Sequence, residues 1–487
     1  MSGDMRKKDE AMRDYRKIYI DGCWGESQGG RVQTIINPAT EAVAGEISLA
    51  TPADVDRAVS AARRALRSYS RTSREDRLSL LNAILGGFAA RRQDLADALV
   101  EELGAPAKFA LEAQVGAGFL HLMTGIEVLK TFAFETPQSP RTVVRREPIG
   151  VIGMITPWNW PINQVMCKLV PALATGNTLV HKPSEVTPFT AHIIAEILHD
   201  AGVPAGVYNL VDGDGPTVGA AISSHRGVDM VSFTGSTRAG VDVARRAAET
   251  VKRVHQELGG KSPNIVLEGA DLQKAVGENI YRLMMNAGQT CHAPTRLLVP
   301  NARLAEAKAI AAAVVQGVTV GDPTGEVYMG PVVSERQWTR IQDLIRKGVE
   351  EGASLVAGGE GRPEGLSQGY YVRPTIFADV TNDMTIAREE IFGPVLCILG
   401  YEDVDQAVAI ANDTDYGLGA YVQAASDDAA LAVAERLEAG MVYINGASED
   451  PAAPFGGYKM SGNGREWGPM AFQEFVEVKA LIRRDAA

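Results

Sequence analysis

Residues 150–161 read Gly-Val-Ile-Gly-Met-Ile-Thr-Pro-Trp-Asn-Trp-Pro, a short apolar run that leads into a turn rich in proline and tryptophan. Runs of this kind recur along the chain, separated by helical patterns or glycine turns, at residues 151–155, 178–181, 207–211, 228–233 and 264–267. Strands that alternate with helices favour a parallel sheet with crossover connections. A second alternating set continues through residues 295–299 and 371–377. The sequence therefore predicts the α/β class, with two α/β domains that meet near residue 260.

Helical signals and a loose arm precede this region. Thr51 and Pro52 form an N-cap followed by proline at the first helical position, which predicts a helix that starts there. A second helix is predicted over residues 77–103, because Gly104 follows as an end signal. Residues 1–17 carry many charges and few apolar anchors, so we expect them to form a loose arm.

The composition narrows the class of protein. A chain of 487 residues, 45% hydrophobic and 22% charged, is typical of a globular protein of two or three domains. A formal net charge of −12 disfavours a nucleic-acid partner. The four cysteines are too scattered for a disulfide framework or a zinc site, so no metal is expected. No apolar leader and no run of about 18 apolar residues is present, which predicts a cytoplasmic protein without a membrane partner.

Cys291 is the candidate nucleophile. It ends a loop of small residues between a predicted helix, residues 275–285, and a predicted strand, residues 295–299. A loop at such a junction can present a side chain on a rigid scaffold. A thiolate attacks a carbonyl carbon well, and a thioester is a good intermediate for later hydrolysis. The alternative is a buried structural cysteine, which is the commoner role of a lone cysteine.

Two further residues suit the hydrolysis of a thioester. Glu257 precedes Gly259 and Gly260 at the proposed domain junction, and a carboxylate with a raised pKa in such a cleft can act as a general base. Asn159 follows the apolar run 151–155, and its side-chain amide can donate to an oxyanion. The alternatives are a surface charge for Glu257 and an ordinary turn residue for Asn159.

The chain lacks a Gly-x-Gly-x-x-Gly motif of standard spacing, since residues 213–219 contain one residue too many. Gly235 and Ser236 follow an apolar run and open a predicted helix, whose N-terminus suits a pyrophosphate. Lys182 and Glu185 follow another predicted strand and are placed to hydrogen-bond the hydroxyls of an adenosine ribose. Taken singly, each of these residues is more commonly a solvated or turn residue.

Taken together, these segments resemble the aldehyde dehydrogenase superfamily over nearly the whole chain. The matching blocks occur in the family's order at residues 37–40, 156–161, 182–185, 233–240, 257–261, 288–291, 390–394, 454–459, 461–462 and 464–466. The resemblance implies an α/β fold of the aldehyde dehydrogenase type. Its parts would be a dinucleotide-binding domain (18–129 and 148–258), a catalytic domain (259–446) and a β oligomerisation arm (130–147 and 468–487).

The resemblance also implies an activity, the NAD(P)-dependent oxidation of an aldehyde to a carboxylic acid. Cys291 matches the family nucleophile, Glu257 the general base and Asn159 the oxyanion donor. Lys168 matches a lysine near the active site, and Glu466 matches a second carboxylate on a proposed proton route. The residues implied to contact the cofactor are Ile155, Thr156, Trp158, Lys182, Ser184, Glu185, Gly215, Phe233, Gly235, Ser236, Leu258, Glu390 and Phe392.

The resemblance implies three properties of binding and assembly. The partner is a small-molecule aldehyde, and the chain forms a homodimer or a homotetramer. Glu185 predicts that NAD is preferred over NADP, because a 2′-phosphate would meet its carboxylate. Lys182 offers a counter-charge beside it, so NADP is expected to be tolerated rather than refused.

Departures from the family pattern bear on the substrate. Cys167 stands where many members carry a bulky aromatic residue, and Asn163 and Gln164 share its helix face. These residues predict a substrate tunnel that is wider and more polar than in enzymes for short aliphatic aldehydes. Met285 stands where succinate-semialdehyde enzymes have an arginine, so a small dicarboxylic semialdehyde is not expected. The rival functions are a CoA-acylating semialdehyde dehydrogenase, which Glu257 disfavours, and a non-catalytic structural homologue.

Overall fold

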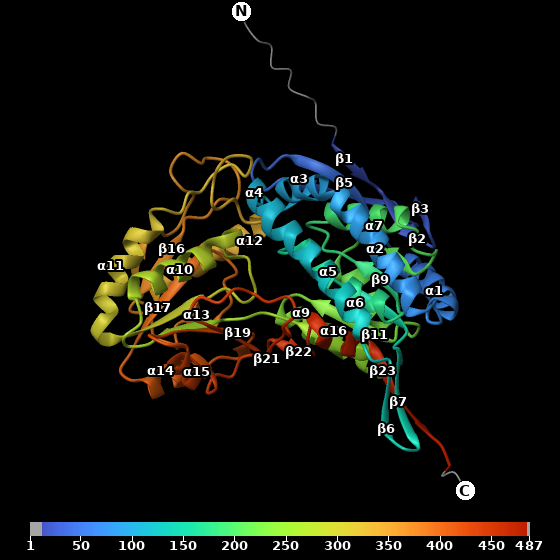
Figure 1. Ribbon diagram of the computed structural model, residues 1–487. Coiled ribbons are helices and arrows are strands. Elements are labelled where there is room, and N and C mark those ends of the chain that lie inside the picture. The colour runs from blue at the N-terminus through green and yellow to red at the C-terminus, as the bar shows by residue number, and fades with distance from the viewer. Residues whose placement is uncertain (1–11, 485–487) are drawn as a thin grey trace, which may run out of the picture.

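The computed structural model describes residues 12–484, which form two large sheets with helices around them and a small sheet that projects from the body (Figure 1). The 8-stranded sheet has the order β22-β12-β11-β8-β9-β10-β2-β3. Its strands are β2 (Lys17–Ile20), β3 (Cys23–Glu26), β8 (Val151–Ile155), β9 (Thr178–Lys182), β10 (Tyr208–Leu210), β11 (Met230–Thr234), β12 (Arg253–Glu257) and β22 (Gly462–Asn463).

The parallel part of this sheet changes direction at β8. From β8 the chain proceeds outward through β9 to β10, and then crosses back to place β11 and β12 on the other side of β8. All the pairings among these five strands are parallel, so their carboxyl ends lie along one edge. In open α/β sheets, ligands bind outside the carboxyl ends at such a reversal of strand order.

The 7-stranded sheet has the order β15-β16-β17-β14-β13-β19-β20. Its strands are β13 (Pro263–Val266), β14 (Arg296–Pro300), β15 (Ser354–Ala357), β16 (Thr375–Ala378), β17 (Val395–Tyr401), β19 (Gly419–Gln423) and β20 (Met441–Ile444). The chain thus changes sheet between the end of β12 at Glu257 and the start of β13 at Pro263. We keep the domain boundaries given above as a proposal, which this change of sheet supports.

The remaining strands form smaller sheets. One contains β1 (Arg13–Tyr15), β5 (Val43–Leu49) and β4 (Arg31–Ile36), and another pairs β18 (Tyr416–Gly417) with β21 (Tyr458–Lys459). The third contains β23 (Val476–Ile482), β7 (Thr142–Pro148) and β6 (Glu135–Ser139), and it extends away from the body (Figure 1). Strands β7 and β23 pair over seven residues, from Thr142 opposite Ile482 to Pro148 opposite Val476. This small sheet therefore joins segments more than 300 residues apart in the sequence.

The helices are α1 (Pro52–Tyr69), α2 (Arg74–Ala90), α3 (Arg92–Glu102), α4 (Ala107–Phe109), α5 (Val115–Thr131), α6 (Pro161–Ala174), α7 (Phe189–Asp200), α8 (Ala220–Ser224), α9 (Thr237–Ala248), α10 (Leu272–Met284), α11 (Leu304–Val315), α12 (Glu335–Glu350), α13 (Thr385–Arg388), α14 (Val404–Asn412), α15 (Asp427–Ala434) and α16 (Gly468–Glu474). Helices α1 to α5 follow one another without an intervening strand, whereas α6 to α9 alternate with the parallel strands of the 8-stranded sheet. Helix α6 is buried along its whole length. Side chains on α6 are therefore fixed by packing on every face.

Most of the predicted elements are present, with three corrections. Thr51 caps α1 through a capping box with Asp54, as its position before proline predicted. The single helix predicted over 77–103 is wrong: α2 ends at Ala90 and α3 begins at Arg92, because Arg91 leaves the helical conformation at φ −105°, ψ 14°. The strand predicted over 371–377 begins only at Thr375. The predicted loose arm is wrong for residues 13–15 and 17, which lie in β1 and β2, whereas residues 1–11 lie outside the described residues.

Separate apolar cores lie beneath the two large sheets. One is built on β8, β9 and β10 with α2, α5, α6 and α7, and another on β13, β14, β16 and β17 with α10, α11 and α12. Among residues 12–484, no helix is both long and apolar enough to cross a membrane. Each sheet is thus anchored by its own core, and the loops between the sheets are available for a site.

Candidate active site

A cavity of about 300 Å³ lies beside Cys291. Its wall is mostly apolar, with a few polar side chains, and comes from α5, α6, the loop before β14 and the segment around residues 449–467. The lining residues are Glu112, Ala113, Gly116, Ala117, Leu120, His121, Trp160, Asn163, Gln164, Met285, Thr290, Cys291, His292, Glu449, Pro451, Phe455 and Trp467. A concave, largely apolar cavity with few polar groups is typical of a small-molecule site.

The turn that presents Cys291 is left-handed over three consecutive residues. Helix α10 ends at Met284, and then Asn286, Ala287 and Gly288 have φ values of 54°, 54° and 75°. A Cβ on Gly288 would lie 2.1 Å from the carbonyl oxygen of Gly393, so the close contact between these two backbones requires glycine. Backbone strain of this kind persists only where surrounding structure holds it, and here it aims Cys291 at the cavity.

Asn159 is held rigidly next to this turn. Its side-chain Nδ2 donates to the carbonyl oxygen of Gln289 at 3.0 Å, while its own backbone oxygen accepts from Gln114 Nε2 at 3.0 Å and from Asn286 Nδ2 at 2.8 Å. An amide carries two N–H groups, so one remains for another acceptor. The donor predicted for an oxyanion is therefore fixed within the loop that carries Cys291.

Glu257 ends β12 with a buried carboxyl group, and neither of its oxygens has a hydrogen-bond partner within residues 12–484. Burial raises the pKa of this carboxyl well above its usual range, and the nearby Glu466 raises it further. A raised pKa and free lone pairs are the properties expected of a general base that acts near neutral pH. A Cβ on Gly456 would lie 2.8 Å from Glu257 Oε1, so the glycine leaves room for this side chain.

Lys168 and Glu466 form a buried ion pair below the cavity. Lys168 Nζ also donates to Thr234 Oγ1 at 2.7 Å, and the Cys167 thiol donates to Glu466 Oε2 at 3.2 Å. Burial opposes the ionisation of Glu466, but the ammonium of Lys168 holds its pKa below the usual range. This pair is thus ionised and has its hydrogen bonds filled.

The thiol of Cys291 meets a negative environment. Burial raises its pKa above the usual range, and the carboxylates of Glu257, Glu390 and Glu466 raise it further. Its Sγ lies 3.9 Å from His292 Nδ1. A thiolate therefore needs a positive charge nearby or a proton acceptor when the reaction begins.

The residues predicted for a dinucleotide converge on the carboxyl ends of the parallel strands. Ile155 at the end of β8 lies opposite Lys182 of β9 on one side and Phe233 of β11 on the other, and Thr234 lies opposite Glu257. The side chains of Ile155, Phe233 and Leu258 belong to one apolar cluster. Residues from 155 to 258 thus meet at the strand ends where the order reverses, the region in which open α/β sheets bind ligands, and we call this region the crevice.

The polar residues of this crevice are already paired in ways that suit a ribose. Lys182 Nζ donates to Glu185 Oε2 at 3.2 Å and to the carbonyl oxygen of Pro183 at 2.6 Å. Thr156 Oγ1 is 2.9 Å from His181 Nε2, and Ser184 Oγ accepts from Val186 N at 3.2 Å. Lysine and glutamate held together at a strand end can share two neighbouring hydroxyl groups as donor and acceptor.

The turns that contain Gly215 and Gly235 differ in how they lie relative to the crevice. Ser236 caps α9 by accepting from Ala239 N at 3.4 Å, which leaves the N-terminus of that helix directed at the crevice edge. Gly235 lies against the ring of Phe233. At Gly215 a Cβ would meet nothing within 4 Å, whereas at Gly219 it would lie 3.8 Å from Lys182 Cδ. Gly219, which the sequence did not single out as a contact, thus lies beside Lys182 and Ile155 of the crevice.

Glu390 and Phe392 reach the crevice from the other sheet. Glu390 Oε1 accepts from Gly260 N at 2.9 Å, and burial raises the pKa of this carboxyl to about 7. Phe392 has its ring 5.3 Å from that of Trp158 in a perpendicular arrangement. The two domains proposed above therefore both contribute to the crevice, on the side nearest Cys291.

Sequence reasoning placed one residue differently and missed several others. Cys167 does not line the cavity beside Cys291: it lines a smaller adjoining one and bonds to Glu466, because α6 turns its thiol inward. Asn163 and Gln164 do line the cavity, as does Met285. The missed lining residues include His121, which is 2.6 Å from Asn163 Oδ1 through Nε2, and Glu449. Neither lies in a recognisable motif, so no local signal would have found them.

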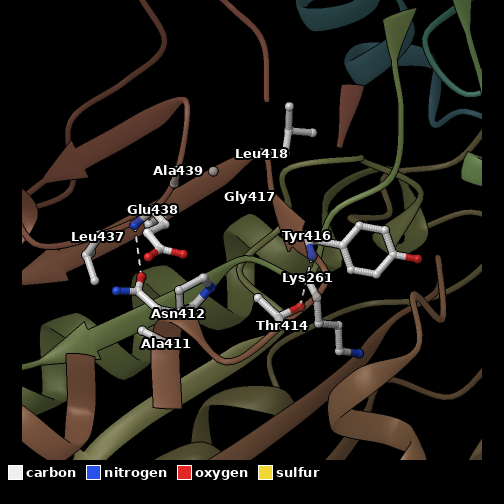
Figure 2. Close-up of a pocket in the computed structure, with 13 residues that line it drawn as sticks. Lys261, Ala411, Asn412, Thr414, Tyr416, Gly417, Leu418, Leu437, Glu438 and Ala439 are labelled. Atoms are coloured by element: carbon white, nitrogen blue, oxygen red, sulfur yellow. Dashed lines mark hydrogen bonds between the residues drawn. The ribbon is translucent and has the colours of Figure 1, made fainter. Parts of the chain in front are cut away.

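Another cavity lies near the start of β13 and is separate from this chemistry. Figure 2 shows the residues that line it, with Thr414 and Asn412 hydrogen-bonded to neighbouring backbone groups. Its volume is about 10 Å³, which is roughly the space of one water molecule. Lys261 borders it with an unpartnered ammonium, whose pKa burial lowers to about 8. This cavity is too small for a substrate.

Comparisons with known proteins agree with the resemblance found in the sequence. The sequence model of the aldehyde dehydrogenase family matches residues 24–481. A 3-succinoylsemialdehyde-pyridine dehydrogenase from a Pseudomonas species is 52% identical over 473 residues, which cover 97% of this chain and 99% of that protein.

Solved structures of similar proteins carry the same fold. A variant of aldehyde dehydrogenase C from Pseudomonas syringae, in complex with NAD⁺ and octanal, is 49% identical with a TM-score of 0.95 and covers 96% of each chain. A betaine aldehyde dehydrogenase from Staphylococcus aureus, in complex with NAD⁺, is 35% identical with a TM-score of 0.93 and covers 96% of this chain and 94% of its own.

Proposed function

The chain belongs to the aldehyde dehydrogenase family and is an enzyme of this kind, and from that premise we propose that it oxidises a neutral, largely apolar aldehyde with NAD through a thioester on Cys291. The observation that carries the proposal is the convergence of Cys291, Asn159 and Glu257 between the cavity and the crevice. The fixed amide of Asn159 and the unpartnered carboxyl of Glu257 flank the thiol-bearing loop.

The first half of the reaction joins Cys291 to the aldehyde. The Sγ thiolate bonds to the carbonyl carbon, and the oxygen takes up negative charge as a thiohemiacetal forms. The free N–H of Asn159 stabilises this oxyanion, which in comparable enzymes is worth about 3–4 kcal/mol. NAD bound in the crevice would supply the acceptor for the hydride of the same carbon. The product on the protein is an acyl thioester.

The second half hydrolyses the thioester. Glu257 removes a proton from water as the oxygen of that water bonds to the acyl carbon, and Cys291 then leaves as the acid departs. The raised pKa of Glu257 makes its carboxyl basic enough for this step. Lys168 and Glu466 lie close enough to influence this pKa, Glu466 raising it and Lys168 lowering it. We assign them to the support of Glu257.

The crevice supports NAD as the preferred cofactor, with NADP tolerated. Lys182 and Glu185 would bind the two hydroxyls of the adenosine ribose, and a phosphate on one of them would lie beside the Glu185 carboxylate. Ile155, Thr156, Trp158, Ser184, Gly215, Phe233, Gly235, Ser236 and Leu258 would border the dinucleotide. Glu390 and Phe392 would hold its nicotinamide end. The presence of NAD⁺ in the structures of two similar proteins supports this cofactor.

The cavity favours a neutral aldehyde. The described residues that line it include the carboxylates of Glu112 and Glu449 but no lysine or arginine, so an anionic substrate would find no cationic side chain in the wall to pair with. Burial alone would raise the pKa of Glu449. The hydrogen bond from His292 and the charges of His292 and Arg282 outweigh burial and lower this pKa to about 2. Octanal and a pyridyl semialdehyde, which occur in the names of similar proteins, are both neutral and have room in about 300 Å³.

We also propose that the projecting sheet of β6, β7 and β23 joins copies of the chain into a homodimer or homotetramer, and that the enzyme is cytoplasmic. Val478 and Ile482 of β23 are 65% and 69% exposed, and apolar side chains on an exposed strand favour a partner surface. Sedimentation at several protein concentrations tests the assembly.

The function is tested by following the absorbance of reduced cofactor with a panel of aldehydes. We expect turnover of octanal and of pyridine-carboxaldehyde with NAD, and at least tenfold lower kcat/KM for succinate semialdehyde. Release of free acid, rather than formation of acyl-CoA when CoA is added, separates hydrolysis from the CoA-acylating alternative. No reduction of NAD with any aldehyde of the panel would contradict the proposal.

A further inference from the structure

His255 is a buried titratable residue that the mechanism above leaves unused. It lies on β12 two residues before Glu257, so both side chains project from the same face of the strand. Among the described residues its Nε2 has no hydrogen-bond partner, and it lies 3.9 Å from Glu257 Oε1, which is also unpartnered there. Its Nδ1 is 3.4 Å from Ser232 Oγ. The imidazole therefore presents an unpartnered nitrogen to Glu257.

The Lys168–Glu466 pair is a less suitable acceptor for the proton of Glu257. Glu466 Oε1 is bonded to Lys168, and Oε2 accepts the thiol of Cys167 at 3.2 Å. Both oxygens of Glu466 are thus engaged by donors, and no hydrogen bond joins Glu466 to Glu257 among the described residues. A route through groups that are still unpartnered is therefore more direct for the deprotonation of Glu257 before the next turnover.

Gly464 opens such a route beside the edge of the imidazole that carries Nε2. A Cβ at Gly464 would lie 2.8 Å from His255 Nε2 and 3.2 Å from the carboxyl carbon of Glu474. The absence of a side chain at Gly464 thus leaves space between the imidazole of His255 and the carboxyl group of Glu474, which a larger residue would fill. Glu474, on α16, is only partly buried and accepts from Arg465 N at 3.1 Å, so its carboxyl group lies at the boundary with solvent.

We propose that His255 and Glu474 form a proton path that carries the proton of Glu257 to solvent after thioester hydrolysis, an inference that rests on the function proposed above. Water gives one proton to Glu257 as its oxygen bonds to the acyl carbon. Glu257 passes that proton to His255 Nε2, the imidazolium passes it to the carboxylate of Glu474, and Glu474 releases it to bulk water. No electron is transferred in these steps, and each group returns to its starting state.

The surroundings of His255 make its protonation brief. The groups that face it are Ser232 of β11, Glu257 of β12, Lys168 of α6, the segment 464–466 and Glu474 of α16. Burial lowers the pKa of His255 to about 4, partly offset by the charge of Glu466. The imidazole of His255 is therefore neutral in the resting enzyme. It takes a proton from protonated Glu257 and releases it quickly, as a relay group does.

The test compares the burst of reduced cofactor with the steady-state rate in His255→Gln and Glu474→Gln. Because the path acts after hydride transfer, both variants should keep a burst of about one reduced cofactor per site. The steady-state rate should fall about 10²-fold in His255→Gln, as for the loss of an acid–base group. The fall should be about tenfold in Glu474→Gln, and the solvent deuterium isotope effect on that rate should increase in both.

Controls separate a relay from a structural role. Glu477→Gln changes an exposed carboxylate three residues from Glu474 and should leave both phases unchanged. The double variant should be no slower than His255→Gln alone, because both residues act in series. A wild-type steady-state rate and isotope effect in folded Glu474→Gln and His255→Gln, or a loss of the burst itself, would overturn the relay. Absence of NAD reduction by the unmodified enzyme with every aldehyde of the panel would instead overturn the proposed function.

Discussion

Gly288→Ala tests whether the left-handed turn before Cys291 positions the thiol. The added Cβ would lie 2.1 Å from Gly393 O and 2.7 Å from Pro394 N, both of which are backbone atoms that cannot rotate away. Strain at φ 75° costs an L-residue about 1–2 kcal/mol, and the overpacking adds about 1–3 kcal/mol. We therefore expect a stability loss of about 2–5 kcal/mol. Relief of the clash must move the turn, and a shift of about 1 Å at a reacting group costs about 10²-fold in rate.

The measurements are the midpoint of thermal unfolding and the rate of the burst of reduced cofactor. Gly277→Ala is the matched control: this glycine lies in α10, has negative φ, and a Cβ there meets nothing within 4 Å. It should raise stability by about 0.5–1 kcal/mol and leave the burst unchanged. If Gly288→Ala has the midpoint and burst rate of the wild type, the turn does not position Cys291 and the reasoning fails.

Three further predictions use other parts of the site. Glu185→Ala should raise kcat/KM for NADP relative to NAD, since the repulsive carboxylate is removed; an effect on NAD alone would leave only its hydrogen-bonding role. Glu449→Gln should raise kcat/KM for succinate semialdehyde several-fold without a change for octanal, and equal changes for both would refute the charge argument. Glu102 is buried, accepts from Phe189 N and Thr190 N, and has a pKa that burial raises from 4.5 to about 8. The protonated Glu102 carboxyl therefore stabilises the folded state fully below about pH 4.5, and this stabilisation is lost as the pH rises through about 8. Glu102→Gln should flatten the fall of the thermal unfolding midpoint between these pH values. An unchanged slope would show that other groups cause the fall.

The sequence predicted the features that local patterns encode. Alternation of apolar runs with helical segments predicted the parallel strands β8, β9, β11 and β13, and the cap at Thr51 located the start of α1. The break at Arg91 was missed because no glycine or proline marks it, and the strand β1 because its apolar contacts come from distant residues. Short charged strands of this kind become stable only through tertiary packing.

Some residues of the candidate site could likewise be predicted from local sequence patterns, and others could not. Cys291, Glu257 and Asn159 lie at element ends, where sequence reasoning can locate them. The inward direction of Cys167, the lining role of Glu449 and the contact between His255 and Glu257 depend on how α6, β12 and the C-terminal segment pack together. Such contacts join residues up to about 300 positions apart and leave no trace in local spacing. The three-dimensional arrangement was therefore needed to find them.

The central claim, that Cys291 carries a thioester which Glu257 hydrolyses, is tested most directly by single-turnover kinetics of Glu257→Gln. With octanal and NAD we predict a burst of about one reduced cofactor per site, followed by a steady-state rate about 10²–10⁴-fold below that of the wild type. Mass spectrometry of the stalled protein should find the octanoyl group on Cys291, and Cys291→Ala should give neither burst nor adduct. A wild-type steady-state rate in Glu257→Gln, or an unmodified Cys291 after the burst, would contradict the account.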